Sequence, residues 1–573
     1  MASNVPELGD LLVQLGLIDQ QQLRTGLDEQ SRTRERLGEI LMRQTDLSPQ
    51  DLVKALAMQG GFECFDASRH AVTPQALDAV PITTARRHHV LPIELTDEVL
   101  TVAVPDPQDV VAMDELRGVA CSRGRRLKVL VGAADELDEQ IDSHYSRIEG
   151  TRVVSDLMNS VATEAAQVRS DDVDEDEIAR SAQDAGVVKL VNQILEQALA
   201  DRATDIHVEP QEKGLNIRYR VDGMLYNALT PPRAVFMGLV SRIKILSNLD
   251  IAERRATQDG RFSYRGNGRE VDVRVSIIPT IHGEKLVLRL LDKTAFNYKL
   301  RDLGFSEVDY KAFADAIRRP YGMILLSGPT GSGKSTTLYA GLLELRDDTL
   351  NIITVEDPVE YQIGRINQVQ VNPRKSVTFA TALRSFLRQD PDVIMVGEIR
   401  DQDTAEIAVR AALTGHMVFS TIHANDAPST ATRLVSMGVE PFMAASAMTM
   451  VAAQRLVRRT CPYCQVEYEP DEETVLALGG PDVLMPDGKI VWKRGTGCVA
   501  CRKRGYLGRV AIIERMMMST QLRQMVAENR PAAAIRERAL QEGMVTLRQS
   551  GIQKAREGTT TLEEVLRVSL SDE

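Results

Sequence analysis

The sequence is poor in aromatic residues, in cysteine and in long apolar runs. Of its 573 residues, 4% are aromatic, one is Trp and six are Cys. Six cysteines are too few for a disulfide-built secreted scaffold. The longest weakly polar stretch, residues 442–453, falls short of the roughly 20 residues that a membrane-spanning helix needs. The N-terminus, with Glu7 and Asp10, lacks the basic-then-apolar order of a signal peptide, so we expect a cytosolic protein.

Positive charge is also scarce. The chain has 69 Lys and Arg against 81 Asp and Glu, a net charge of −12, which argues against a protein that coats nucleic acid. A hydrophobic share of 43% excludes global disorder. At roughly 150 residues per domain, the length predicts three or four domains. Acidic residues crowd the stretch 171–177, which predicts a flexible linker at residues 151–185.

A phosphate-binding motif follows a short apolar run. Residues 323–327 predict a buried strand, and the next nine residues match G-x-x-x-x-G-K-[ST] before a helix that starts near Lys334. In such a loop, backbone N–H groups converge on a phosphate at the positive end of the helix. We expect Lys334 to neutralise the β- and γ-phosphate oxygens and the Ser335 hydroxyl to bind Mg²⁺. The predicted ATP-binding residues are Gly328, Pro329, Thr330, Gly331, Ser332, Gly333, Lys334, Ser335 and Thr336.

Three further predicted strands end in residues suited to metal binding and proton transfer. From about residue 303, strand and helix patterns alternate, which predicts a parallel sheet whose strand ends meet at one edge. Carboxylates end the strands at 353–360 and 392–398, and histidines flank the strand at 417–419. The candidate residues are Glu356, Asp357, Glu360, Glu398, His416 and His423.

The stretches GPTGSGKST, TVEDPVEY, RQDPDVIMVGEIRD and TGHMVFSTIHAND together resemble the secretion ATPases of type II secretion and type IV pilus assembly. The resemblance runs from about residue 186 to the C-terminus. It implies an α/β multidomain protein with a RecA-like P-loop ATPase domain at 301–573 and a preceding α+β domain at 186–300. It also implies a homohexamer that drives pilus or pseudopilus assembly with an inner-membrane platform protein and a membrane-tethered docking protein.

The same resemblance assigns roles to the candidate residues. Glu398 matches the catalytic glutamate, and Gly397 stands where many P-loop enzymes have a metal-binding Asp. The acids at 356, 357 and 360 match the family's acidic box, and the two histidines its histidine box. Arginines of the smaller domain approach the phosphates in this family, and Arg261 and Arg274 match those positions. Arg455 is a further candidate.

Four cysteines form two C-x₂-C pairs with 33 residues between them, and they read as a structural Cys₄ zinc site within an insertion at about residues 458–510. They are Cys461, Cys464, Cys498 and Cys501. A redox dithiol is the less favoured alternative, because it is more often a single pair. Cys64 and Cys121 have no partner pattern and are expected to be small buried hydrophobes.

The first 60 residues contain a repeat with an offset of 29, and its helical spacing predicts two helical hairpins. The repeat resembles the tandem cyclic di-GMP-binding MshEN modules of some family members, in a regulatory module at residues 1–150 that ends in a small α/β unit. The resemblance points to Arg36, Gly38, Gln59, Gly9 and Gln30, with Glu7 in place of the first arginine. Asp106 is a weaker candidate for a guanine edge. A docking adaptor is the alternative.

Two other functions compete with the motor. A DNA-translocating ring ATPase would fit the phosphate motif, but the acidic net charge and the lack of a basic-aromatic face count against it. A nucleotide sensor with a degenerate motor is disfavoured by intact Lys334, Ser335 and Glu398. The sequence alone does not separate type II secretion from type IV pilus assembly.

Overall fold

The computed structural model describes a defined part of the chain: residues 8–33, 37–45, 47–66, 70, 72–121, 124–138, 140–141, 144–145, 185–266, 269–292, 298–480, 484, 490–498 and 500–569. These residues form two compact units, one mainly of residues up to Gln197 and one mainly of residues from Ala198 onward. The acidic stretch 171–177 lies outside the described residues. No described helix combines the length and apolarity that crossing a bilayer requires.

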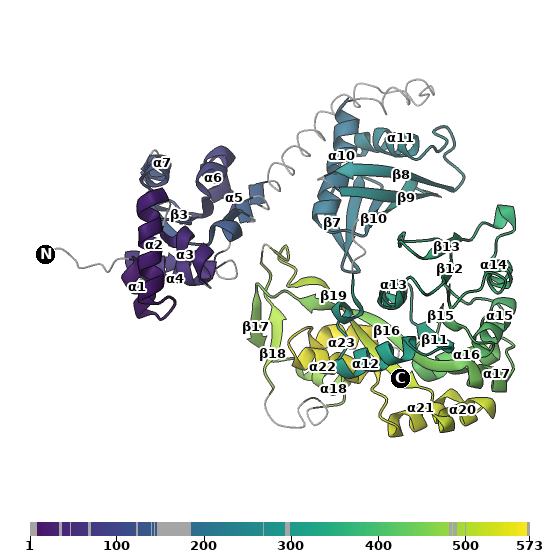
Figure 1. Ribbon diagram of the computed structural model, residues 1–573. Helices are drawn as coiled ribbons and strands as arrows, with labels where there is room; N and C mark the ends of the chain where they lie inside the picture. The colour runs from purple at the N-terminus through teal and green to yellow at the C-terminus, as the bar shows by residue number, and fades with distance from the viewer. Residues whose placement is uncertain are drawn as a thin grey trace. The chain divides into compact units, whose positions relative to one another are not determined.

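The N-terminal repeat folds as two helical hairpins, as predicted (Figure 1). Ser48 caps the last of the four helices by accepting the Asp51 N–H, and Asp19 caps the second in the same way through the Gln22 N–H. The helices are α1 (Leu8–Gln14), α2 (Gln20–Thr33), α3 (Leu37–Gln44) and α4 (Pro49–Gly60).

Close packing accounts for the glycine that recurs in each copy of the repeat. A Cβ on Gly9 would lie 2.4 Å from a methyl carbon of Leu23, and a Cβ on Gly38 would lie 2.9 Å from one of Leu52. A side chain at either position would therefore force that leucine side chain to move, so glycine lets the two helices of each hairpin pack closely. The recurring glycine thus has a packing role within each hairpin.

An α/β unit completes the N-terminal part. Its sheet has the order β1-β4-β3-β2, with β2 antiparallel to β3 and the other pairs parallel. Cys64 is half-buried and Cys121 is exposed, so the expectation that both are buried is wrong. The elements are β1 (Glu63–Cys64), α5 (Pro74–Ala79), α6 (Ile82–His88), β2 (Leu91–Leu95), β3 (Val99–Val104), α7 (Val110–Cys121) and β4 (Arg126–Val131).

The predicted α+β domain begins the second half of the chain, with a six-stranded antiparallel sheet in the order β7-β6-β5-β10-β9-β8. Apolar residues alternate with charged ones along its strands, so that one face is apolar and the other charged. The elements are α10 (Ala185–Ala200), β5 (Asp205–Pro210), β6 (Leu215–Val221), β7 (Met224–Leu229), α11 (Phe236–Leu246), β8 (Gln258–Gly266), β9 (Arg269–Thr280) and β10 (Gly283–Asp292).

A seven-stranded sheet with helices on both faces follows, in the order β13-β12-β14-β15-β11-β16-β19. All neighbours pair in parallel except β16 and β19, so the expectation of a wholly parallel sheet is wrong at this edge. β16 and β19 are consecutive strands of this sheet, joined by the cysteine insertion, and they pair in opposite directions at its edge. The strands are β11 (Gly322–Ser327), β12 (Ile352–Glu356), β13 (Asn367–Gln370), β14 (Val393–Val396), β15 (Met417–Ile422), β16 (Met448–Thr460) and β19 (Tyr506–Met517).

Two buried apolar clusters, one against each face of this sheet, make its core. The helices are α12 (Glu307–Ile317), α13 (Lys334–Leu345), α14 (Phe379–Phe386), α15 (Gln402–Leu413), α16 (Ala427–Ser436), α17 (Pro441–Ala447), α20 (Thr520–Ala527), α21 (Ala532–Gln541), α22 (Leu547–Arg556) and α23 (Leu562–Ser569). The insertion between β16 and β19 contains β17 (Gln465–Tyr468), α18 (Glu472–Ala477) and β18 (Trp492–Gly495).

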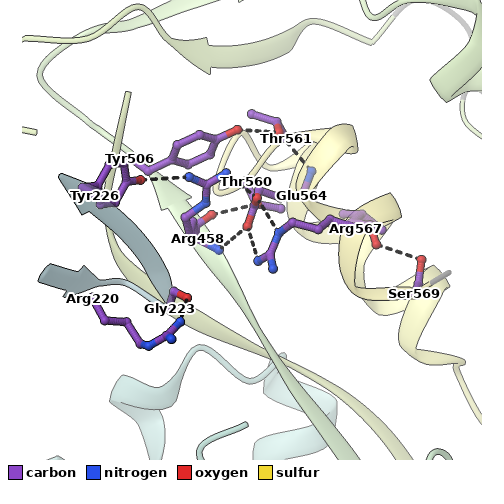
Figure 2. A network of polar contacts seen from close by, with 11 residues as sticks. Arg220, Gly223, Tyr226, Arg458, Tyr506, Thr560, Thr561, Glu564, Arg567 and Ser569 are labelled. Carbon is purple, nitrogen blue, oxygen red and sulfur yellow. Dashed lines mark hydrogen bonds and ion pairs between the residues drawn. The ribbon is translucent and has the colours of Figure 1, made fainter. Parts of the chain in front are cut away.

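A polar network joins the C-terminal helix to this sheet and to the α+β domain (Figure 2). Glu564 of α23 is 2% exposed and forms ion pairs with Arg458 of β16 at 2.5 Å and with Arg567 at 2.8 Å. Burial by itself raises the pKa of Glu564, but hydrogen bonds from the two arginines outweigh it and lower that pKa to about 2. Arg458 also donates to the hydroxyl of Tyr226 in β7 at 3.4 Å.

Candidate functional site

The phosphate loop connects β11 to α13 as the motif predicts. Gly328, Gly331 and Gly333 have positive φ angles, which favour glycine, and a Cβ on Gly328 would lie 2.5 Å from the Gln454 carbonyl oxygen. The Nζ of Lys334 donates to the carbonyl oxygens of Gly328 at 2.7 Å and Pro329 at 3.0 Å. Burial lowers the pKa of Lys334 to about 8, against the opposing charge of Glu398.

A cavity of about 760 Å³ lies beside this loop. It brings together most of the predicted site: the loop from Thr330 to Thr336, the three acids that follow β12, and Glu398 with His423. The α+β domain also contributes residues to the lining of this cavity. Gly328 and Pro329, at the start of the loop, line a neighbouring hollow instead. The cavity thus combines phosphate-binding backbone, cations and carboxylates, the groups that phosphoryl transfer uses.

Glu398 follows β14 and is flanked by two basic side chains. It forms an ion pair with Arg400, and its Oε2 lies 3.5 Å from the Nε2 of His423, which follows β15. A Cβ on Gly397 would lie 3.3 Å from the Val355 carbonyl oxygen, so close packing on β12 accounts for glycine at a position where many P-loop enzymes have Asp. A carboxylate flanked by two basic side chains beside a phosphate loop is well placed to orient water.

His416 is not brought to this cavity. It precedes β15, whereas His423 follows it, so the two histidines lie at opposite ends of a six-residue strand. The His416 Nδ1 lies 3.0 Å from the Ala411 carbonyl oxygen, and its own carbonyl accepts the N–H of Gly322 at the start of β11. The expectation that both histidines gather at one edge is met by His423 alone, because a strand sends its two ends to opposite edges of the sheet.

The three acids of the acidic box have different surroundings. Glu356 is buried at the end of β12, where burial raises its pKa against the hydrogen bonds that it accepts. Asp357 is exposed to the cavity. Glu360 is half-buried, and its Oε2 lies 3.3 Å from the guanidinium of Arg274 in β9.

The predicted arginines are distributed over three places. Arg274 reaches the acidic box, as its ion pair with Glu360 shows. Arg261 pairs in register with Arg274 and lines a hollow of the α+β sheet outside the phosphate-loop cavity. Arg455 is buried and donates to the Asn425 carbonyl oxygen at 3.1 Å, so it supports the loop region from within the domain.

Four arginines that motif matching missed line the phosphate-loop cavity: Arg220, Arg289, Arg400 and Arg509. Strand register contained a clue to two of them. Arg289 pairs with Arg274 on one side and with Asp205 on the other, and Asp205 pairs with Arg220, so these residues form one row across the sheet. Alternation along the strands shows which residues share a face, but only the pairing order shows that they are neighbours.

The four predicted zinc ligands lie together. Their Sγ atoms are all within 4.8 Å of one another, and all four residues are buried. A backbone hydrogen bond from the Cys461 N–H to the Gly505 carbonyl oxygen, at 2.9 Å, connects the first cysteine pair to the segment that follows the second pair. Four converging thiols fit tetrahedral zinc, which would take every coordination position and leave none for water. The residues therefore fit a structural zinc ion.

A second cavity, of about 550 Å³, lies between the N-terminal repeat and the α/β unit. The predicted residues of both repeat copies line it, namely Gly9, Gln30, Gly38 and Gln59, together with Asp106. Arg36 and Glu7 lie outside the described residues. Two further carboxylates, Asp10 and Asp135, line the cavity, and no Lys or Arg is among the described residues that do.

Comparisons with known proteins agree with this geometry. The family model described as Type II/IV secretion system protein matches residues 180–567. The chain is 43% identical over 563 residues to the type IV pilus assembly ATPase PilB of Myxococcus xanthus, covering 98% of each chain. The chain belongs to the type II/IV secretion system protein family. It is also 43% identical over 507 residues to the type II secretion system protein E of Pseudomonas aeruginosa, covering 88% of this chain and 98% of that one.

Membership of the type II/IV secretion system family confirms the predicted resemblance and supports an ATPase. The ATPase DotB of Legionella pneumophila shares the fold, with a TM-score of 0.50 and 21% identity over 67% of this chain and 95% of its own. An MshEN domain model matches residues 61–151, which are the α/β unit and the residues after it. The repeat at residues 8–60 lies outside the matched range.

Proposed function

We propose that the protein is a hexameric ATPase motor of the bacterial cytoplasm that drives the assembly of a pilus or a pseudopilus. The observation that carries the proposal is the cavity in which the phosphate loop, Glu398 and arginines of two domains meet. The close similarity to a pilus assembly ATPase and to a type II secretion protein supports this assignment over the full length of the chain.

Each group of the cavity has a task in ATP hydrolysis. The backbone N–H groups of the loop bind the phosphates and Lys334 neutralises their charge, and Ser335 with the nearby carboxylates would hold Mg²⁺. When bound, Mg²⁺ supplies further neutralisation at the phosphate oxygens. Glu398, held by Arg400 and His423, orients the attacking water and accepts its proton.

Arginines of the α+β domain link this chemistry to movement. Arg220 and Arg289 come from one domain, whereas Lys334 and Glu398 come from the other. Charge that develops on the phosphates attracts the arginines, and phosphate release removes that attraction. Domain closure and opening would therefore follow the ATPase cycle, as in other enzymes that close over their substrate. An inner-membrane platform protein and a membrane-tethered docking protein would receive this motion.

The motor assignment is tested in cells that depend on this chain. Replacing it by Lys334→Ala should abolish either surface pili or the release of type II substrates, while the level of the protein stays normal. Scoring both phenotypes in one strain identifies the machine. Normal piliation together with normal secretion would contradict the proposal.

We infer that cyclic di-GMP binds the N-terminal cavity and regulates the motor. The match to the MshEN domain and the convergence of Gln30, Gln59 and Asp106 support this regulation. Carboxylates and amides pair well with the donors of a guanine edge, whereas phosphate needs a cation, which Arg36 would supply. Calorimetric titration of the full chain with cyclic di-GMP tests the inference, and no detectable heat at high micromolar ligand would favour a docking adaptor.

A further inference from the structure

Both oxygens of the Glu356 carboxylate accept hydrogen bonds from side chains of the same domain. Its Oε1 accepts the Thr354 hydroxyl at 2.6 Å and the Gln368 amide at 3.1 Å, and its Oε2 accepts the hydroxyl of Tyr339. Three hydrogen bonds from side chains leave little of this carboxylate for a metal or a water. Glu356 is also 4% exposed, although it lines the cavity.

Glu360 differs from Glu356 in the hydrogen bonds that its carboxylate accepts. Its Oε2 accepts no hydrogen bond from any residue that the structure describes, although the Arg274 guanidinium lies 3.3 Å away as an ion-pair partner. A buried carboxylate oxygen without a donor is costly unless something else binds it. Of the two glutamates of the acidic box, Glu360 is therefore the one with a carboxylate oxygen that accepts no hydrogen bond from the described residues, and the residue lines the cavity.

Tyr339 connects the two glutamates. It lies in α13, the helix that begins at the phosphate-loop lysine, and it is fully buried. Its hydroxyl donates to Glu356 and accepts the backbone N–H of Glu360 at 3.4 Å. One hydroxyl thus fixes both the end of β12 and the segment that presents Glu360 to Arg274 of the α+β domain.

We propose that Glu356 and Tyr339 are positioning residues for ATP hydrolysis, which hold Glu360 toward the cavity without touching nucleotide, metal or water. This inference rests on the proposed ATPase function. It changes the role that the family resemblance implies for Glu356, because a filled carboxylate acts through its neighbours. It also adds Tyr339, a residue that none of the motif assignments included.

Three variants separate the two roles in the full chain. Tyr339→Phe keeps the buried ring but removes the hydroxyl, so kcat should fall about five- to twentyfold while the KM for ATP stays within twofold. Glu356→Gln keeps an acceptor for Thr354, so kcat should fall less than about fivefold, with an unchanged Mg²⁺ concentration for half-maximal rate. Glu360→Gln should lower kcat on the order of 100-fold.

Tyr310→Phe is the matched control. It removes another tyrosine–glutamate hydrogen bond to α13, between Tyr310 and Glu344 at 3.3 Å, away from the cavity. It should leave kcat and KM within twofold of the wild type. A hundredfold loss in Glu356→Gln, or a tenfold higher Mg²⁺ requirement, would overturn the proposal by assigning Glu356 to the metal or the water. Wild-type kcat in Tyr339→Phe would overturn it as well.

Hydrogen exchange gives a readout that does not depend on turnover. Tyr339→Phe should speed deuterium uptake in a peptide covering residues 353–363, because the Glu360 N–H loses its acceptor, whereas Tyr310→Phe should not. Unchanged exchange in Tyr339→Phe would contradict the positioning role. A wild-type chain with no more turnover than Lys334→Ala would instead contradict the proposed ATPase function, so the two failures are distinguishable.

Discussion

The phosphate-loop cavity and the N-terminal cavity differ in the charges that line them. The first has Lys334 and four arginines among five carboxylates, a mixture that suits phosphates together with a divalent cation. The second has three carboxylates and three glutamines, with no Lys or Arg among its described lining residues. If both take a nucleotide, the first recognises it mainly by its phosphates and the second mainly by the edges of its bases.

This difference bears on regulation. A cavity that binds phosphates can change its affinity and its conformation when the γ-phosphate leaves, which suits a motor. A cavity that reads base edges binds a ligand that the protein does not consume, and a regulatory ligand of this kind couples its binding to the state of the motor, which suits a sensor. Of the predictions that follow, those on Lys334, on the glutamines of the N-terminal cavity and on the pH dependence of binding ask whether the two sites are as different as their linings.

Removing the phosphate-loop cation should have the largest effect. Lys334→Ala should lower ATP turnover on the order of 100-fold or more, because the charge of the phosphates is no longer neutralised. Titration of the same variant with cyclic di-GMP should give the wild-type affinity. A steady-state phosphate-release assay measures the first quantity and calorimetry the second. A variant that lost both would show that the two cavities are not chemically independent.

Acid should lower the free energy of unfolding of the second compact unit, which contains the ATPase domain. The pKa of Glu564 is about 2 in the folded state against an ordinary value of 4.5, so its ion pairs stabilise fully above pH 4.5 and fade as pH falls toward 2. Glu564→Gln should cost about 2–3 kcal/mol at pH 7, after allowance for solvent screening, and progressively less in acid.

Fluorescence makes that test selective. Trp492, the single tryptophan of the chain, is buried in the cysteine insertion of the second half, so its emission in a urea titration reports on that half alone. Equal midpoints for wild type and Glu564→Gln at pH 7 would refute the network in Figure 2 as a source of stability.

The glutamines of the N-terminal cavity should have a smaller and local effect. Gln30→Ala combined with Gln59→Ala should weaken cyclic di-GMP binding about tenfold, since each loses hydrogen bonds to a base. Basal ATP turnover should not change. Gln14→Ala, on an exposed part of α1 outside the cavity, is the matched control. Wild-type affinity in the double variant would show that cyclic di-GMP does not bind in this cavity.

The pH dependence of binding gives the smallest expected difference. Since the pKa of Lys334 is about 8 and phosphates favour its charged form, ATP binding takes up a proton above pH 8. The Kd for ATP should therefore rise severalfold from pH 8 to pH 9. The Kd for cyclic di-GMP should stay level over that range, because no described residue lining its cavity is a lysine. Equilibrium titrations with a non-hydrolysable ATP analogue and with cyclic di-GMP measure both.

Local pattern was sufficient for much of the fold and of the site. The run before the phosphate loop, the glycines and the helix from Lys334 are neighbours in sequence, and the structure has them as β11 and α13. The capped hairpins of the repeat were equally local. By contrast, β19 runs antiparallel to β16, and no local pattern encodes that direction.

The site residues that sequence could not find depend on contacts between distant segments. Arg220 and Arg289 reach the cavity through the pairing order of the α+β sheet, and His416 is excluded from it by the direction of β15. In the sequence, nothing distinguishes Tyr339 from other helix residues. Only the folded structure shows its hydrogen bonds with the Glu356 carboxylate and the Glu360 N–H. The motifs thus indicate the type of chemistry, whereas the order of the strands in the sheets determines which side chains line the same cavity.

ATP binding and hydrolysis by Glu398→Gln test the central claim most directly. From the proposed roles of Glu398 at the attacking water and of Lys334 at the phosphates, we expect the variant to bind ATP within about twofold of the wild type while turnover falls on the order of 100-fold. Retained binding with lost hydrolysis is the result that the account predicts. Turnover close to that of the wild type would contradict the assignment of Glu398 and, with it, the ATPase site described above.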